Sequence, residues 1–202
     1  MTTVQTQILS LKGSAKMVTE FFGYAVQTIL YSRALYPDTS FKQEQKYGLS
    51  LMITTEEGVK TFLDNILKQL NLWLVQKKAQ KLVLAVKDVE TDEVIETWRF
   101  NVENSSEREE EEADVDKIRR AIQNLMRQII SSVAFLPVPA DDIRRAFDLL
   151  VYTDKNAETP PLWEETGPQL VAHKHREEVQ LPGFNTGIHK VDALVAYKVN
   201  LS

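Results

Sequence analysis

The chain has 202 residues, of which 43% are hydrophobic and 26% charged, enough to bury the core of one soluble domain. Its net charge of −5 argues against a general nucleic-acid binder, because such proteins hold phosphates with an excess of Lys and Arg. The lack of cysteine excludes disulfides, zinc ribbons and cysteine nucleophiles, and it fits a reducing compartment.

A long amphipathic helix is predicted near the N-terminus. Ser14 is its expected N-cap, because a serine hydroxyl can accept hydrogen bonds from amides of the first turn. Apolar residues then recur at helical spacing from Val18 to Leu30. The helix should end by about Tyr36, since Pro37 disfavours helical geometry in the residue before it.

A second helix is predicted after the segment Leu49–Ile53, which is either a short strand or a buried connection. Thr54 and Glu57 have the spacing of a capping box at the start of this helix. Its apolar stripe includes Trp73, whose position in register with the stripe indicates a core residue.

A β-hairpin is expected next. Lys81–Val86 is a continuous apolar run, typical of a strand covered on both faces. Val94–Val102 alternates, so that Trp98, Phe100 and Val102 share one face. The polar segment Asp88–Glu93 joins the two strands as a turn.

A block of like charges, Glu109–Glu112, should repel into an extended loop and place negative charge before a third helix. That helix is predicted from about Asp114 to Ser132. Its second side mixes basic and apolar groups, which leaves open both an ordinary flank and a partner interface. The residues of this side are Arg119, Gln123, Met126, Arg127 and Ile130.

The last third of the chain is read as strands. Ser132–Leu136 and Phe147–Tyr152 are candidates, and Glu178–Leu181 with Val191–Val199 form a C-terminal hairpin candidate. Helices interspersed with hairpins, without regular alternation, predict a single α+β domain with a largely antiparallel sheet and helices on one face.

No motif for catalysis is present, whether a glycine-rich phosphate loop, a zinc-binding helix or a nucleophile elbow. His173 and His175 would share a strand face and could hold a metal, but a solvated loop pair is the expected arrangement. We therefore expect a binding protein without catalytic residues, cofactor or metal. The apolar strand Phe147–Tyr152 is the kind of edge that captures an extended peptide.

Several strings of residues resemble the HORMA-domain family, in the right order and over almost the whole chain. The longest are Phe147–Lys155, Trp163–Gln169 and Ile188–Lys198, and shorter ones are Gly13–Ala15, Ile29–Tyr31, Gln45–Leu49 and Arg127–Ile129. The departures lie in loops, at the acidic run and in the turn from Val138 to Ala146, which carries Arg144 and Arg145.

The resemblance implies three long helices packed on a largely antiparallel sheet, with a core over about 10–153 and a mobile safety belt over about 154–202. It also implies two conformers. In the open form the C-terminal hairpin covers the edge strand Phe147–Tyr152. In the closed form the hairpin moves to the other sheet edge, a ligand peptide adds as a strand, and the belt passes over it.

The resemblance also implies residue roles. The peptide-binding edge and belt would use Phe147, Leu149, Val151, Tyr152, Trp163, Val179, Leu181 and Tyr197. An open–closed self-dimer would use Arg127, Gln128 and Phe135. Leu11, just before the first helix, would control the conformer, because its segment should pack along a sheet edge in the open form alone.

The implied function is that of a spindle-assembly-checkpoint adaptor in nucleus, kinetochore and cytoplasm. Its implied partners are the activator subunit of the anaphase-promoting complex, a coiled-coil kinetochore receptor, a checkpoint kinase-like complex member, and an AAA-type ATPase with its adaptor. The alternative is a HORMA subunit of a translesion DNA polymerase or of a meiotic chromosome axis. Neither nucleic acid nor membrane is an expected partner.

Overall fold

The structure is a computed structural model, and it describes residues 6–138, 143–161, 163–172 and 174–199. The helices are α1 (Leu11–Ser32), α2 (Glu57–Val75) and α3 (Val115–Ser131), with short 3₁₀ helices η1 (Asp38–Ser40) and η2 (Ser132–Ala134). The strands are β1 (Gln7–Ser10), β2 (Phe41–Lys46), β3 (Leu49–Thr54), β4 (Ala79–Asp88), β5 (Val94–Asn104), β6 (Glu110–Ala113), β7 (Arg145–Thr153), β8 (Arg176–Asn185) and β9 (His189–Lys198). Within the described ranges, none of the helices has the length and apolar character needed to cross a membrane.

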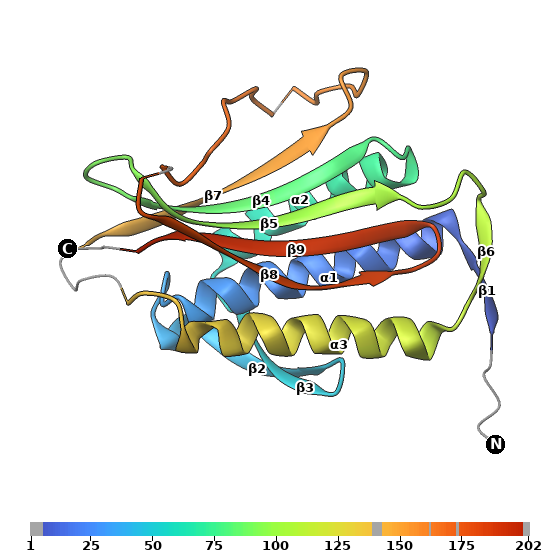
Figure 1. The fold of residues 1–202 in the computed structure, drawn as a ribbon, viewed down its shortest axis with the longest axis horizontal. Helices are drawn as coiled ribbons and strands as arrows, with labels where there is room; N and C mark the ends of the chain where they lie inside the picture. Colours follow the sequence, from blue (N-terminus) through green and yellow to red (C-terminus); the bar gives the residue numbers. More distant parts are fainter. Residues whose placement is uncertain (1–5, 139–142, 162, 173, 200–202) are drawn as a thin grey trace.

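Five strands form the main sheet, in the order β7-β4-β5-β9-β8, and every neighbouring pair is antiparallel. The C-terminal hairpin β8–β9 therefore extends the sheet on the β5 side, far from β7 (Figure 1). Two small sheets, β1–β6 and β2–β3, lie outside it. This arrangement confirms the predicted α+β class and the antiparallel sheet.

The main core lies between the sheet and the helices. Helix α1 is buried along its length and contacts α2, α3 and β3, while α3 runs beside β8. Alternate residues of β5, including Trp98 and Phe100, point into this core and are fully covered. Phe100 meets the rings of Phe21 and Phe22 edge-on, with centroids 5.7 and 5.6 Å apart.

The opposite face of the sheet carries a smaller apolar cluster. Val83 and Ala85 of β4 point to it, while their neighbours in β4 point to the helices, as the pleat requires. The other buried members of this cluster are Val94 of β5, Leu150 of β7 and Val171, from the segment after β7. The prediction that β4 is covered on both faces is confirmed.

Two predicted helix starts were wrong. Helix α1 begins one turn early, because the Ser10 hydroxyl accepts from the Gly13 amide at 3.1 Å and Ser14 is buried inside the helix. Thr54 does not cap α2, because it ends β3 and its hydroxyl donates to the Ser40 carbonyl at 3.3 Å. The buried position of Trp73 was predicted correctly.

Other predictions need correction. The segment Ser132–Leu136 is not a strand, because α3 continues directly into η2. The acidic block is extended as expected, but Glu110–Ala113 pairs with β1 as the strand β6. An extended strand separates like charges along its length and leaves most of them in water, which makes this pairing tolerable. Strand β2 pairs with β3, the segment that was expected to be a strand or a buried connection. Strand β2 itself was not predicted, because its sequence is mostly polar and has no apolar pattern.

A buried ion pair joins the end of α1 to the main sheet. The Arg33 guanidinium, just after α1, contacts the Glu96 carboxylate of β5 at 2.8 Å, and both side chains are almost fully covered. Arg33 also donates to the Pro137 carbonyl at 2.7 Å, and the Trp98 ring nitrogen donates to Glu96 at 2.7 Å. Arg145 of β7 donates to the Arg33 carbonyl at 2.7 Å. Helix α1, β5 and β7 are thus tied at one point.

Candidate functional site

Strand β7 has one free edge. On its inner side it pairs with β4 from Arg145 to Thr153. On its outer side no strand pairs with it in the part of the chain that the structure describes. The outward N–H and C=O groups of β7 are therefore available to another extended chain.

The segment 154–175, here called the connecting segment, runs from β7 back to β8 and is anchored on the helix side of the sheet. The ring of Trp163 meets Trp73 of α2 edge-on, with centroids 4.9 Å apart. The Trp73 ring nitrogen donates to the Glu158 carbonyl at 3.3 Å. Both contacts fix this part of the segment against the main core.

The same segment is anchored a second time on the opposite face. Val171 is only 2% exposed and packs with Leu150 and Val83 in the smaller cluster. Since Trp163 lies on one face of the sheet and Val171 on the other, the chain between them must pass around the edge of β7. Figure 1 shows the segment rising beyond β7 before it returns toward β8.

A groove lies between this crossing chain and β7. Its volume is about 340 Å³, and its walls come from the end of β7 and from Trp163–Thr166. Trp73, Leu149, Val151 and Trp163 give it an apolar part. Its charged lining consists of Asp154, Glu164, Glu165 and Lys155, with the acidic groups in excess. The sequence prediction placed Leu149, Val151, Tyr152 and Trp163 here, and the structure brings all of them to this groove.

A second hollow, of about 380 Å³, lies at the other end of β7. Phe147 meets the rings of Tyr36 and Phe62 edge-on, with centroids 6.3 and 6.0 Å apart. Phe62 is 43% exposed, although it belongs to the apolar stripe of α2. This pocket was not predicted from the sequence. The feature that could have indicated it is the apolar stripe of α2, which is wider than the face of the helix that the core covers.

Three residues predicted for the peptide site do not reach the groove. Val179 and Leu181 lie in β8 and Tyr197 lies in β9, so β4 and β5 separate them from β7. Leu181 and Tyr197 are buried in the main core, and the Tyr197 hydroxyl donates to Glu177 at 2.9 Å. In this arrangement they hold the hairpin and cannot contact a strand beside β7.

The predicted dimer residues are exposed around the C-terminal end of α3. Arg127 and Gln128 are exposed on the helix itself, and Phe135 is 46% exposed just after η2. Ile130 and Val133, in the same stretch of chain, are exposed apolar residues. Met126 was assigned to the same side as Arg127 from the sequence but is fully buried. The buried face of α3 is wide enough to include Met126 as well as the Ile and Leu residues of the stripe.

Two further predicted positions differ in place. Leu11 is the first residue of α1 and not a residue before it, and its amide donates to the Glu109 carbonyl at 2.6 Å. His175 is exposed before β8, while His173 lies outside the described residues. Among the described residues, no group of His, Asp and Glu could hold a metal ion.

The comparisons with known proteins agree on one family. The HORMA domain profile matches residues 14–189. The mitotic spindle assembly checkpoint protein MAD2A of Homo sapiens is 42% identical over 197 residues, covering 96% of this chain and 94% of its own length. The MAD2A protein of Dictyostelium discoideum is 44% identical over 195 residues, covering 95% and 94%.

Solved structures give the same result. A chain in a crystal structure of the mitotic checkpoint complex superimposes with a TM-score of 0.85 at 41% identity, covering 93% of this chain and 99% of that one. Caenorhabditis elegans HTP-2, bound to the HIM-3 closure motif, has a TM-score of 0.75 at 11% identity, covering 96% and 93%, and so shares the fold.

The chain therefore belongs to the HORMA domain family. Within that family its relatives at about 42% identity are MAD2 mitotic spindle checkpoint proteins, and this identity extends over nearly the full length of both chains. This identity and the match to a chain of the mitotic checkpoint complex favour a spindle-checkpoint protein over the alternative reading.

The two anchors of the connecting segment give a first prediction. Trp163→Ala should raise amide hydrogen exchange across residues 154–159 about tenfold, because an aromatic pair and its buried area together contribute ~1.4 kcal/mol or more. Leu170→Ala, a matched control at a half-exposed position of the same segment, should leave exchange unchanged. Equal exchange in the Trp163 variant and the native protein would show that this contact does not hold the segment.

Proposed function

We propose that this chain is a spindle-assembly-checkpoint adaptor that captures an extended peptide beside β7 and thereby delays anaphase. The observation that carries the proposal is a free strand edge crossed by the chain's own connecting segment. A peptide added to β7 would be enclosed between that edge and the crossing segment. Such a site binds without catalysis.

Backbone hydrogen bonds would supply generic affinity, and side-chain pockets would supply selectivity. Residues Phe147, Leu149 and Val151 face the helices, so alternate residues of an added strand would face the same way. Phe147 and Val151 are about 13 Å apart along the strand. An apolar side chain could therefore enter the aromatic hollow while another, four residues away, entered the groove beside Trp163.

The charge of the groove adds a preference. Asp154, Glu164 and Glu165 line it together with one cation, Lys155, so negative charge is in excess there. Opposite charge at an interface favours association and its rate. We therefore expect peptides with apolar residues at alternate positions and Lys or Arg where they emerge from the groove.

The proposed partners are those that the family resemblance implies. They are the activator subunit of the anaphase-promoting complex, the coiled-coil kinetochore receptor, a checkpoint kinase-like complex member, and an AAA-type ATPase with its adaptor. The chain would act in nucleus, kinetochore and cytoplasm. Support comes from the 41% identity to a chain of the mitotic checkpoint complex and from the closure motif bound by the same fold in HTP-2.

Capture also needs a route for the peptide to enter. In the proposed open form the hairpin β8–β9 covers β7, and in the closed form it pairs with β5, the position seen in this structure. The hairpin and the connecting segment together would be the safety belt, over about 154–202. Release would require the belt to move, so dissociation should be slow.

The test is selection of peptides from a random library on the purified chain, followed by capture of partners from mitotic extract. The proposal expects extended peptides with the apolar spacing above, and the activator subunit and kinetochore receptor among the captured proteins. Recovery of translesion-polymerase or chromosome-axis components instead would overturn the checkpoint assignment. An absence of any selected peptide would overturn peptide capture itself.

The aromatic hollow gives a second prediction. Phe62→Ala should weaken binding of a selected peptide about tenfold, equivalent to ~1.4 kcal/mol, because an apolar anchor is lost from the pocket. Leu72→Ala is the control, since Leu72 is 54% exposed on the same helix but does not line the hollow. Calorimetric titration decides the matter, and equal loss in both variants would count against a peptide pocket here.

The proposed open–closed dimer gives a third prediction. Arg127→Glu should abolish the dimer while peptide capture persists, because a reversed charge at a desolvated contact costs several kcal/mol. Lys117→Glu, exposed near the start of α3 and outside the side that carries Arg127, should leave the dimer intact. Analytical sedimentation measures this, and a dimer that survives the Arg127 change refutes the interface.

Leu11 gives a fourth prediction, as the proposed conformer control. It is half-buried at the start of α1 here, and we propose that it packs against a sheet edge in the open form. Leu11→Ala should then shift the ratio of conformers about tenfold toward closed, since a differential of ~1.4 kcal/mol suffices. Ile8→Ala, 65% exposed in β1, is the control. Amide spectra without ligand report the two populations, and an unchanged ratio would exclude this role.

A further inference from the structure

A buried histidine lies where the C-terminal hairpin docks on the helices. His189 is the first residue of β9 and is 0% exposed. Its Nδ1 lies 2.7 Å from the Ser14 hydroxyl of α1, and its Nε2 lies 3.1 Å from the Leu74 carbonyl of α2. One side chain of the hairpin therefore contacts both helices.

The hydrogen-bond partners fix the tautomer. The Leu74 carbonyl can only accept, so Nε2 carries the proton and donates to it. Nδ1 is then the acceptor, and the Ser14 hydroxyl donates to it. The Thr186 hydroxyl lies 2.6 Å from Ser14 Oγ and completes the cluster from the turn between β8 and β9.

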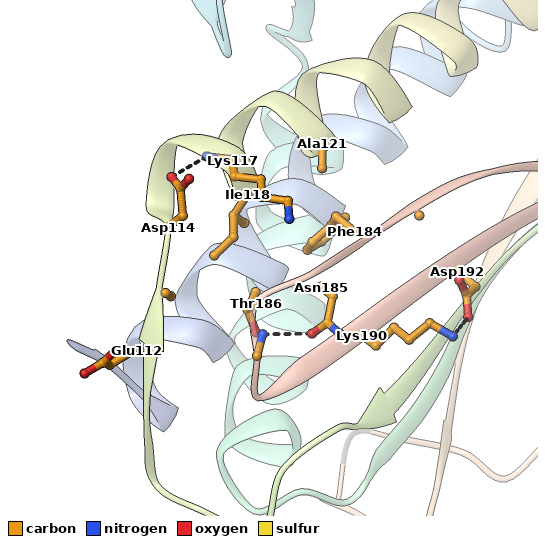
Figure 2. A pocket seen from close by; sticks show the side chains of 13 residues that line it. Glu112, Asp114, Lys117, Ile118, Ala121, Phe184, Asn185, Thr186, Lys190 and Asp192 are labelled. Atoms are coloured by element: carbon orange, nitrogen blue, oxygen red, sulfur yellow. Dashed lines mark hydrogen bonds and ion pairs between the residues drawn. The ribbon is translucent and has the colours of Figure 1, made fainter. Parts of the chain in front are cut away.

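The turn itself is shaped around this cluster. The amides of Ile188 and His189 donate to Thr186 Oγ1 at 3.2 and 2.9 Å. Figure 2 shows Thr186 on the turn, across a hollow from the first turn of α3. The hairpin thus reaches the helices through polar groups that are all paired.

We propose that His189 is the positioning residue that latches the β8–β9 hairpin in its place on β5, and that only its neutral form does so. The inference rests on the proposed function, because it assumes that the hairpin leaves this place when the belt opens. Acidification should therefore favour release of the hairpin and of a captured peptide.

The charges around the ring support this. Burial lowers the pKa of His189, Lys77 after α2 lowers it further, and the Leu74 carbonyl opposes the change. On β6, the Glu111 side chain lies beside Gly187, but its carboxylate accepts from Ser106 at 2.7 Å. On β5, Asn104 stands opposite His189 and is neutral. No carboxylate hydrogen-bonds the ring within the described ranges.

A second proton would keep the two hydrogen bonds of the ring, because the Ser14 hydroxyl can rotate to accept from Nδ1–H. The rotated hydroxyl would then point its proton at Thr186 Oγ1, whose two lone pairs already accept from the amides of Ile188 and His189. Protonation therefore costs burial of a positive charge and weakens the contact between Ser14 and Thr186.

The direction of the pH effect follows from linkage. The docked state has a lowered histidine pKa, so it binds fewer protons than a state in which the ring is in water. Docking is fully favourable above about pH 6.5, the ordinary histidine value. Below that pH the equilibrium constant for docking falls about tenfold per pH unit, until the pH reaches the pKa of His189 in the docked state.

The experiment measures the affinity of a library-selected, fluorescein-labelled peptide at pH 7.5 and pH 5.5. The native chain should bind more weakly at pH 5.5, by more than about threefold and at most about tenfold. His189→Gln, which can still donate to the Leu74 carbonyl but cannot titrate, should change less than about threefold. His173→Gln/His175→Gln leaves His189 as the single histidine of the chain and should behave like the native protein.

Equal pH dependence in His189→Gln and the native chain, or none in the native chain, would overturn the latch. The double histidine variant keeps the test valid if His189→Gln does not fold. If no peptide binds at pH 7.5, the proposed function fails by itself. Ligand-free amide spectra then decide the latch: loss of the Val191 and Ala193 docked signals below pH 6.5 in the double variant supports it, and their persistence overturns it.

Discussion

The frame β7-β4-β5 has two edges, and the chain has one C-terminal hairpin to cover them. In this structure the hairpin pairs with β5 over the stretch that matches Glu96 with Tyr197 and Asn104 with His189. The edge of β7 is consequently left to the connecting segment, which crosses it without pairing in the described part of the chain. An uncovered edge is a liability unless something is meant to occupy it. The proposed peptide site is therefore a consequence of where the hairpin lies.

Much of the hairpin's contribution to the core depends on that position. Val191, Val195 and Leu181 are buried among residues of the helices and of β5. Gly183 permits the close approach, since a Cβ there would lie 2.3 Å from the Val191 carbonyl, at the irregularity in the β8–β9 register. Undocking would expose this apolar surface as well as the His189 cluster. A hairpin held by both packing and a buried polar cluster should move slowly, which suits a device that retains its ligand.

The spacing of apolar residues predicted the helices and most of the strands of the main sheet, because these depend on local sequence. The apolar runs of β4, β5 and β7 and the stripes of the helices were visible in the sequence, because each must bury a face. The start of α1 could not be predicted in this way, since Ser10 and Ser14 are equally good N-cap residues. Tertiary contacts decide between them, because Ser14 hydrogen-bonds with Thr186 and Ser10 is left to cap the helix. The candidate site could be predicted in part. Trp163 and the edge strand were identified from the sequence, but Phe62 of the aromatic hollow was assigned to the apolar stripe of its helix. Which sheet edge the hairpin occupies is a choice between long-range pairings of similar pattern, and no local signal separates them.

The buried ion pair shows which parts of the frame stay fixed. Glu96 lies at the end of β5 that receives Tyr197, while Arg145, at the start of β7, donates to the Arg33 backbone. Both edges are thus tied to the end of α1 through Arg33, and breaking such a buried pair by removing one partner typically costs about 3–5 kcal/mol. That cost favours a fixed distance between the two edges of the sheet. The proposed conversion could then be confined to the hairpin, the connecting segment and the N-terminal strand. A rigid frame with two edges and one movable cover would be sufficient for the proposed two-state capture of a peptide.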